Sequence, residues 1–97
     1  MNMKKISLQI GLPITIFKEG KSYVAYSPAL DLSTSASTYK KAQSRFLNAT
    51  KLFLEELVEM GTLDVVLSGL GWQKVKTSWQ PPVVVSNYTQ PMNLVYA

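Results

Sequence analysis

The fold is decided by residues 37–61, which read STYKKAQSRFLNATKLFLEELVEMG. Apolar side chains recur in this stretch at three- and four-residue spacing, at positions Ala42, Phe46, Ala49, Phe53, Leu57 and Met60. This spacing predicts a long amphipathic helix over residues 39–60 with one apolar face. Ser37 or Thr38 can cap its first turn with a hydroxyl, and Gly61 can end it in the left-handed conformation.

Upstream of this helix, apolar residues alternate strictly with other residues, at Ile6, Leu8, Ile10, Leu12, Ile14 and Ile16. The alternation predicts one long strand with a buried face, and Pro13, which has no N–H, predicts an edge, a bulge or a bend within it. Residues 18–21 form a turn that contains Gly20, so we expect a hairpin back to a second strand over residues 22–26. A short third strand is expected within residues 30–36.

A second, shorter helix is expected downstream of the first, with apolar positions at Leu63, Val66, Leu67 and Leu70. Thr62 can cap its start, and Gly69 and Gly71 are suited to end it. We expect Trp72 to anchor the chain where it leaves this helix.

The C-terminal residues are the least regular part of the sequence. Residues 73–82 indicate an extended connector, residues 83–85 either a brief strand or an extended apolar segment, and residues 92–97 a final strand. We therefore expect a single α+β domain with the order β-β-β-α-α-β, in which a three- to four-stranded antiparallel sheet carries the long helix on one face. Residues 1–72 form its body, and residues 73–97 are an extension of the same domain whose final strand extends a sheet edge or swaps to a neighbour.

The 97 residues include no cysteine and no histidine, and no GxGxxG or P-loop pattern occurs. These absences exclude disulfides, thiolate metal sites and Ser-His-Asp triads. The helix glutamates fall on its expected solvated side, at Glu55, Glu56 and Glu59. Asp31 lies in a turn, where its side chain more often bonds backbone N–H groups than acts as a base. We therefore expect a non-enzymatic protein with no catalytic residue, cofactor or metal.

The net charge is +4, and most of the basic residues lie in the first half of the chain. A basic group falls early in the long helix, at Lys40, Lys41, Arg45 and Lys51. These side chains are candidates for contact with nucleic-acid phosphates, and the alternative is a solvated charged surface. No apolar run is long enough to span a bilayer and the N-terminus has no signal-peptide core, so we expect a cytoplasmic protein without membrane contact.

An ordered series of motifs runs through the middle of the chain. Residues 23–34 read YVAYSPALDLST and are followed by Ser37-Thr38 and by Ala42 in the helix. An aromatic-x-Ala strand, a Pro-x-Leu turn, a short strand, a Thr helix cap and an Ala one turn later together resemble the HicB-like antitoxin family. The helix exit, Met60-Gly61-Thr62-Leu63 with Leu70-Gly71-Trp72, is similar to that of shorter members, and the resemblance covers about residues 8–72.

The resemblance implies a partial ribonuclease-H-like fold without ribonuclease activity. It also implies a domain that binds and neutralises a small RNA-cleaving toxin, usually as a dimer or a larger assembly. The chain departs from the family in two ways. Residues 73–97 cannot make the C-terminal DNA-binding domain of full-length antitoxins, and the positive net charge is opposite to that expected of a protein that blocks an RNA-binding toxin.

We therefore expect an antitoxin-like protein-binding module, and the alternative is a nucleic-acid-binding protein that uses the basic group. Candidate partner contacts are Tyr23, Tyr26 and Asp31, with packing against the helix as the alternative for the tyrosines. Three apolar residues widen the helix stripe and are candidate contacts of a homodimer, at Leu47, Leu54 and Val58.

Overall fold

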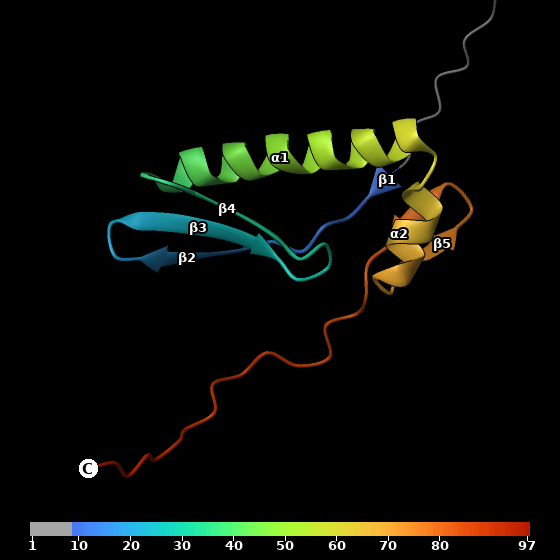
Figure 1. Cartoon of the computed structure of the whole chain (residues 1–97). Helices are drawn as coiled ribbons and strands as arrows, with labels where there is room; N and C mark the ends of the chain where they lie inside the picture. The colour runs from blue at the N-terminus through green and yellow to red at the C-terminus, as the bar shows by residue number, and fades with distance from the viewer. Residues whose placement is uncertain (1–8) are drawn as a thin grey trace, which may run out of the picture.

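The computed structural model describes residues 9–97, in which six strands and two helices form (Figure 1). Their bounds are β1 Gln9–Ile10, β2 Thr15–Glu19, β3 Ser22–Ser27, β4 Leu32–Ala36, α1 Tyr39–Met60, α2 Leu63–Gly69, β5 Gln73–Val75 and β6 Ser78–Gln80. Strands β2, β3 and β4 form an antiparallel sheet in that order, and β1, β6 and β5 form a second, smaller sheet. The expected α+β class and element order are confirmed. Neither helix of this part of the chain is both long and apolar enough to cross a membrane.

The single long N-terminal strand predicted from the alternation is wrong. Within the described residues the alternating run divides into β1 and β2, with an unpaired linker over residues 11–14; Ile6 and Leu8 lie outside the described residues. Strand β1 pairs in parallel with β6, whereas β2 pairs antiparallel with β3. Pro13 lies in the linker, because proline lacks the backbone N–H that a strand ladder requires. The predicted bend at Pro13 is therefore the point at which the chain passes from one sheet to the other.

The β2–β3 hairpin is closed by the two-residue loop Gly20-Lys21, with Glu19 opposite Ser22. Gly20 has a φ of +60°, which glycine adopts at the first central position of a type II′ hairpin turn. A turn over residues 28–31 then leads to β4, and Asp31 takes a φ of +52° there. Aspartate tolerates this left-handed conformation, so Asp31 lies in a turn as predicted, but its carboxylate accepts from the Tyr26 hydroxyl, where backbone N–H donors were expected.

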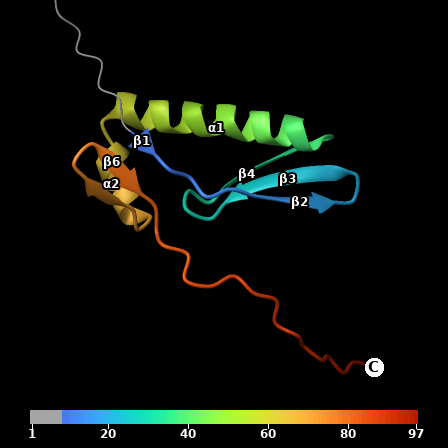
Figure 2. The same cartoon turned by 180° about the vertical axis from the view of Figure 1, so that it is seen from behind.

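Helix α1 begins and ends at the predicted residues. The hydroxyl of Thr38 accepts a hydrogen bond of 3.1 Å from the backbone N–H of Lys41, which caps the first turn. Gly61 ends the helix with a φ of +69°. The helix covers one face of the β2-β3-β4 sheet, as Figures 1 and 2 show from opposite sides.

Two clusters of buried side chains form along α1. Under its first half, a compact cluster consists of Ala25, Ala36, Ala42 and Phe46. At its C-terminal end, a larger cluster consists of Ala29, Leu30, Leu57, Leu63, Leu67, Trp72 and Trp79. Alanines on both the sheet and the helix allow a close approach, and the Phe46 ring fills the space beside them.

Strands β5 and β6 correct the prediction of an extended connector over residues 73–82. They form a hairpin with the loop Lys76-Thr77, in which Lys76 takes a left-handed φ of +57°. The loop has no glycine or asparagine, the residues by which such hairpins are usually recognised. Pairing of β6 with β1 places Trp79 in the larger cluster.

Thr62 precedes α2 as predicted, but its side chain makes no capping hydrogen bond.

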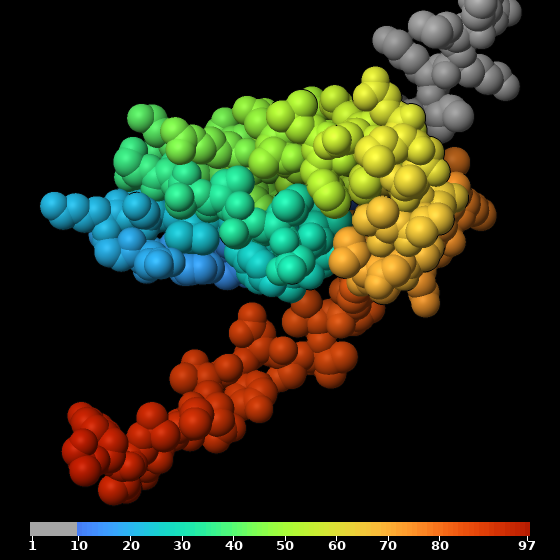
Figure 3. All heavy atoms as spheres, in the orientation of Figure 1, coloured from blue at the N-terminus to red at the C-terminus, as the bar shows by residue number. Residues whose placement is uncertain are grey.

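The final strand predicted over residues 92–97 does not form within the single molecule. Residues 81–97 contain neither helix nor strand and extend away from the body, as the space-filling view shows (Figure 3). The valines at 83–85 are likewise extended and exposed. Alternating apolar residues form a strand only where a neighbouring strand pairs with them, and within residues 9–97 no strand of the same molecule lies beside this segment.

The two tryptophans give a matched test of one buried hydrogen bond. Each is 3% exposed, and the indole N–H of Trp72 donates to the carbonyl of Ala29 over 2.8 Å, whereas that of Trp79 finds no hydrogen-bond partner within residues 9–97. We expect Trp72→Phe to lower the free energy of unfolding by about 1–3 kcal/mol more than Trp79→Phe, because only Trp72→Phe leaves a buried carbonyl without its donor. Urea unfolding of both variants measures the difference, and equal losses would contradict this reading.

Candidate binding surfaces

The face of the β2-β3-β4 sheet opposite α1 is a continuous surface built by alternation. Ala25, Ser27 and Ala36 point toward the helix and are buried, so their strand neighbours point the other way. Cross-strand pairs place Val24 between Phe17 and Ser35, and Tyr26 between Thr15 and Ser33. We call this surface the open sheet face; its residues are Thr15, Phe17, Glu19, Ser22, Val24, Tyr26, Ser33 and Ser35. No helix in residues 9–97 covers it (Figures 1 and 2).

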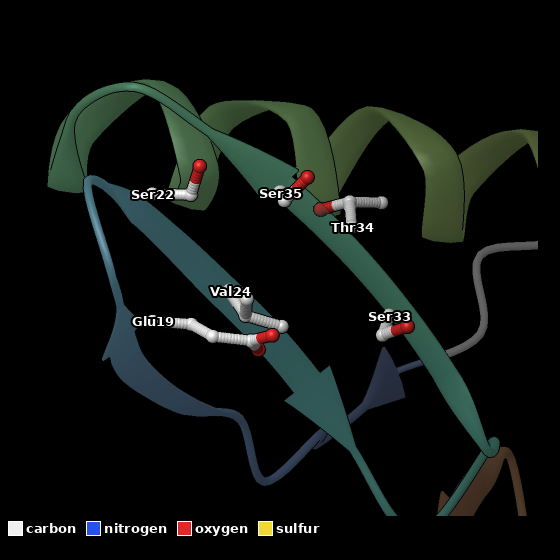
Figure 4. A pocket seen from close by; sticks show the side chains of 6 residues that line it. All are labelled: Glu19, Ser22, Val24, Ser33, Thr34 and Ser35. Carbon is white, nitrogen blue, oxygen red and sulfur yellow. The ribbon is translucent and has the colours of Figure 1, made fainter.

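A shallow hollow of about 420 Å³ lies over this part of the sheet. Its lining consists of Glu19, Ser22, Val24, Ser33, Thr34 and Ser35 (Figure 4). The serines are small, so the backbone of β3 and β4 is accessible on both sides of the half-buried Val24 side chain. Val24 is the apolar centre of this lining, and polar side chains surround it, so a partner would meet hydrogen-bonding groups around one apolar contact.

The open sheet face has the opposite charge to the chain as a whole. Glu19 is its only charged strand residue, Asp31 stands at one end beside Tyr26, and Lys21 stands in the hairpin loop at the other end. Lys18 points to the helix side, where its ammonium lies 5.7 Å from the centre of the Tyr23 ring. With one lysine against two carboxylates, the face and its two flanking turns carry a net charge of about −1 on a chain whose net charge is +4.

Two of the three predicted partner contacts come together on this face. The Tyr26 hydroxyl donates to the Asp31 carboxylate over 3.3 Å. Loss of solvent around the phenol raises the pKa of Tyr26 above its ordinary value of 10.0, and the negative charge and hydrogen bond of Asp31 raise it further. Tyr26 therefore stays a neutral donor at physiological pH. Tyr23 lies on the other face and meets Tyr39 edge to face, with ring centres 6.5 Å apart, so the alternative of packing against the helix holds for Tyr23.

The predicted nucleic-acid contacts do not form one surface. All four side chains are exposed, but at about 100° per residue Lys40 and Lys51 lie roughly 80–140° around the helix from Lys41 and Arg45. The Arg45 guanidinium also donates to the carbonyl of Ser35 over 3.0 Å. This bond ties the helix to the edge of β4 and uses part of the donor capacity that a phosphate would need.

The predicted dimer contacts lie on one flank of α1. Leu47 and Val58 are each 59% exposed, and Leu54 is half-buried. Two of the three line a pocket of about 210 Å³ between the helix and the β1–β2 linker. We call it the flank groove; its lining is Ile10, Leu12, Ile14, Phe46, Leu47, Thr50, Lys51 and Leu54. The linker side of the groove was not predicted, because a single long strand would have placed these residues in a sheet.

Acidic side chains do not gather into a metal site within residues 9–97. The three helix glutamates are exposed, and Asp64 lies 3.9 Å from the ammonium of Lys74 in an exposed ion pair.

Comparison of the chain with known protein families, with curated proteins and with solved structures finds no match.

Thr50 gives a test of the groove's apolar character. It is 7% exposed, and in the part of the chain that the structure describes its hydroxyl has no hydrogen-bond partner. We expect Thr50→Val, which keeps the shape and removes the buried hydroxyl, to leave the free energy of unfolding unchanged or to raise it by up to about 1 kcal/mol. Thr38→Val is the matched control, because it removes the helix cap and should cost about 1 kcal/mol. Chemical denaturation of both variants checks that stability falls for Thr38→Val and does not fall for Thr50→Val. A clear loss of stability for Thr50→Val would contradict the assignment of the groove as apolar.

Proposed function

We propose that the protein is a non-enzymatic binding module that holds a basic protein partner on its open sheet face. The observation that carries this proposal is the combination of an uncovered sheet face with a local acidic charge on a basic chain. Glu19 and Asp31 supply that charge, and Tyr26 stays a neutral hydrogen-bond donor between Asp31 and the centre of the face. Complementary charge steers the encounter and sets the register, while the apolar centre supplies the contact area.

The motif series over residues 23–34 supports an antitoxin-like role for this module. A toxin that cleaves RNA needs a basic surface to hold its substrate, and an acidic face can cover such a surface in competition with the RNA. The positive net charge of the whole chain does not oppose this role, because the lysines of α1 lie away from the open sheet face. The partner proposed is therefore a small basic RNA-cleaving protein, met in the cytoplasm.

Nucleic-acid binding by α1 is the second candidate. The exposed lysines at 40, 41 and 51 favour it, since each can neutralise a phosphate. Two observations count against a continuous surface for phosphates. Lys40 and Lys51 lie on a different side of the helix from Lys41 and Arg45, and the Arg45 guanidinium is hydrogen-bonded to Ser35. The two candidates predict opposite effects of added positive charge at two exposed serines.

Ser33→Arg and Ser44→Arg form the matched pair for this test. Ser33 is exposed on the open sheet face, whereas Ser44 is exposed on α1. We expect Ser33→Arg to reduce capture of a basic protein from the native lysate at least roughly tenfold, because it places a bulky like charge in the interface. Ser44→Arg should leave capture unchanged. Quantitative mass spectrometry of the material retained by tagged wild type and both variants gives the measurement.

The proposal is supported if the retained protein is small and basic, is encoded beside this chain and is lost only with Ser33→Arg. Retention of nucleic acid alone, released by salt and increased by Ser44→Arg, would overturn it and favour the helix surface. Circular dichroism of both variants confirms that the substitutions leave the fold intact.

A further inference from the structure

The C-terminal segment carries a large amount of apolar surface that the rest of residues 9–97 leaves exposed. Its large apolar side chains are from 58% to 101% exposed; they are Val83, Val84, Val85, Tyr88, Met92, Leu94, Val95 and Tyr96. Residues 83–97 contain no charged side chain. Monomeric proteins rarely leave so much contiguous apolar surface in water, so the segment has the character of a chain that is covered by a protein surface.

The flank groove offers an apolar surface of matching chemistry beside an unpaired backbone. Lys51 is the only charged residue in its lining, and Ile14 and Leu47 are 43% and 59% exposed. Among residues 9–97, the linker over residues 11–14 pairs with no strand and β2 pairs only with β3, so within this part of the chain the other edge of β2 has free N–H and C=O groups. Such an edge is a template for one more strand, and the groove beside it accepts every second side chain of that strand.

The way in which the segment leaves the body favours a second molecule as the source of the strand. Pro81 and Pro82 stiffen the exit, and the Pro82 ring lies against Gly71, 3.3 Å from where a Cβ would stand. Gly71 has a φ of +90°, so this contact depends on glycine. From this fixed point the segment runs away from the body in both views (Figures 1 and 2). Exchange of such a segment between identical chains is a low-cost route to a dimer.

We propose that residues 92–97 of one copy add as a strand to the edge of β2 in a second copy and fill its flank groove, and that the exchange is reciprocal. Strand alternation places Met92, Leu94 and Tyr96 on the groove side, with Asn93 and Val95 on the other. Pro91 stands just before the strand, where a proline does not interrupt a ladder. Two exchanged segments and the grooves that hold them bring roughly 30 residues into contact, about 15 on each side, which is a small interface.

Four single substitutions in the full-length protein test the two sides of this contact. Leu94→Glu places a charge on the groove side of the segment, and Asn93→Glu places it on the outer side. Leu47→Glu places a charge in the groove, and Leu52→Glu places it on the other flank of the same helix, at a residue that is 68% exposed. We expect Leu94→Glu and Leu47→Glu to weaken dimerisation at least roughly tenfold, and their controls to leave it unchanged.

Light scattering at micromolar concentration measures the mass, which should be twice 10.8 kDa for wild type. A monomeric wild type, or a dimer that survives both Leu94→Glu and Leu47→Glu, would overturn the proposal. Leu94 is outside the folded body, so a loss of dimer with Leu94→Glu does not reflect unfolding.

Mixing Leu94→Glu with Leu47→Glu distinguishes two arrangements. In one, the segment is exchanged between molecules; in the other, it docks on the groove of its own molecule. A Leu47→Glu copy keeps an intact segment, and a Leu94→Glu copy keeps an intact groove, so together they restore one of the two contacts. Differently tagged variants should therefore co-purify with each other, although neither associates with itself. A mixture that stays monomeric would contradict exchange.

Discussion

Helix α1 is the element on which both cores depend. Its first half meets the sheet through Ala42 and Phe46, which pack with the sheet residues Ala25 and Ala36, and its end contributes Leu57 to the cluster that holds α2 and both tryptophans. The alanines set how closely the helix approaches the sheet, since any larger side chain between them would push the layers apart. With 22 residues and a length of about 33 Å, the helix spans both sheets and holds them in one body.

The single helix also decides which surfaces remain for binding. It covers one face of the β2-β3-β4 sheet and leaves the other to solvent, and the period of two in the strands then sorts the charges between these faces. Lys18 goes to the helix side, whereas Glu19 goes to the open sheet face with Asp31 at its end. The net charge of the chain is therefore a poor description of the surface that a partner meets. The same geometry leaves the outer edge of β2 and the apolar flank groove unpartnered.

The sequence predicted the parts of the fold that depend on local interactions. The bounds of α1, its Thr38 cap, Gly61 and the turn at Asp31 follow from nearby residues and were found correctly. Pairing between distant segments was not predictable, because alternation shows which side chains share a face but not which strand lies beside them. The parallel pairing of β1 with β6 therefore appeared as one long strand, and the β5–β6 hairpin escaped recognition because Lys76 takes the position usually held by glycine. Of the candidate site, Tyr26 and Asp31 were foreseen, but the serines around Val24 were not, since small hydroxyl residues give no signal until the sheet is assembled.

Chemical footprinting of the captured complex tests the central claim most directly. Carbodiimide labelling reports whether the carboxylates of Glu19 and Asp31 are accessible, and acetylation reports the same for the lysines at 40, 41 and 51. If the open sheet face holds the partner, labelling of Glu19 and Asp31 falls in the complex while the lysines react as in the free protein. Protection of the lysines with unchanged labelling of Glu19 and Asp31 would contradict the account.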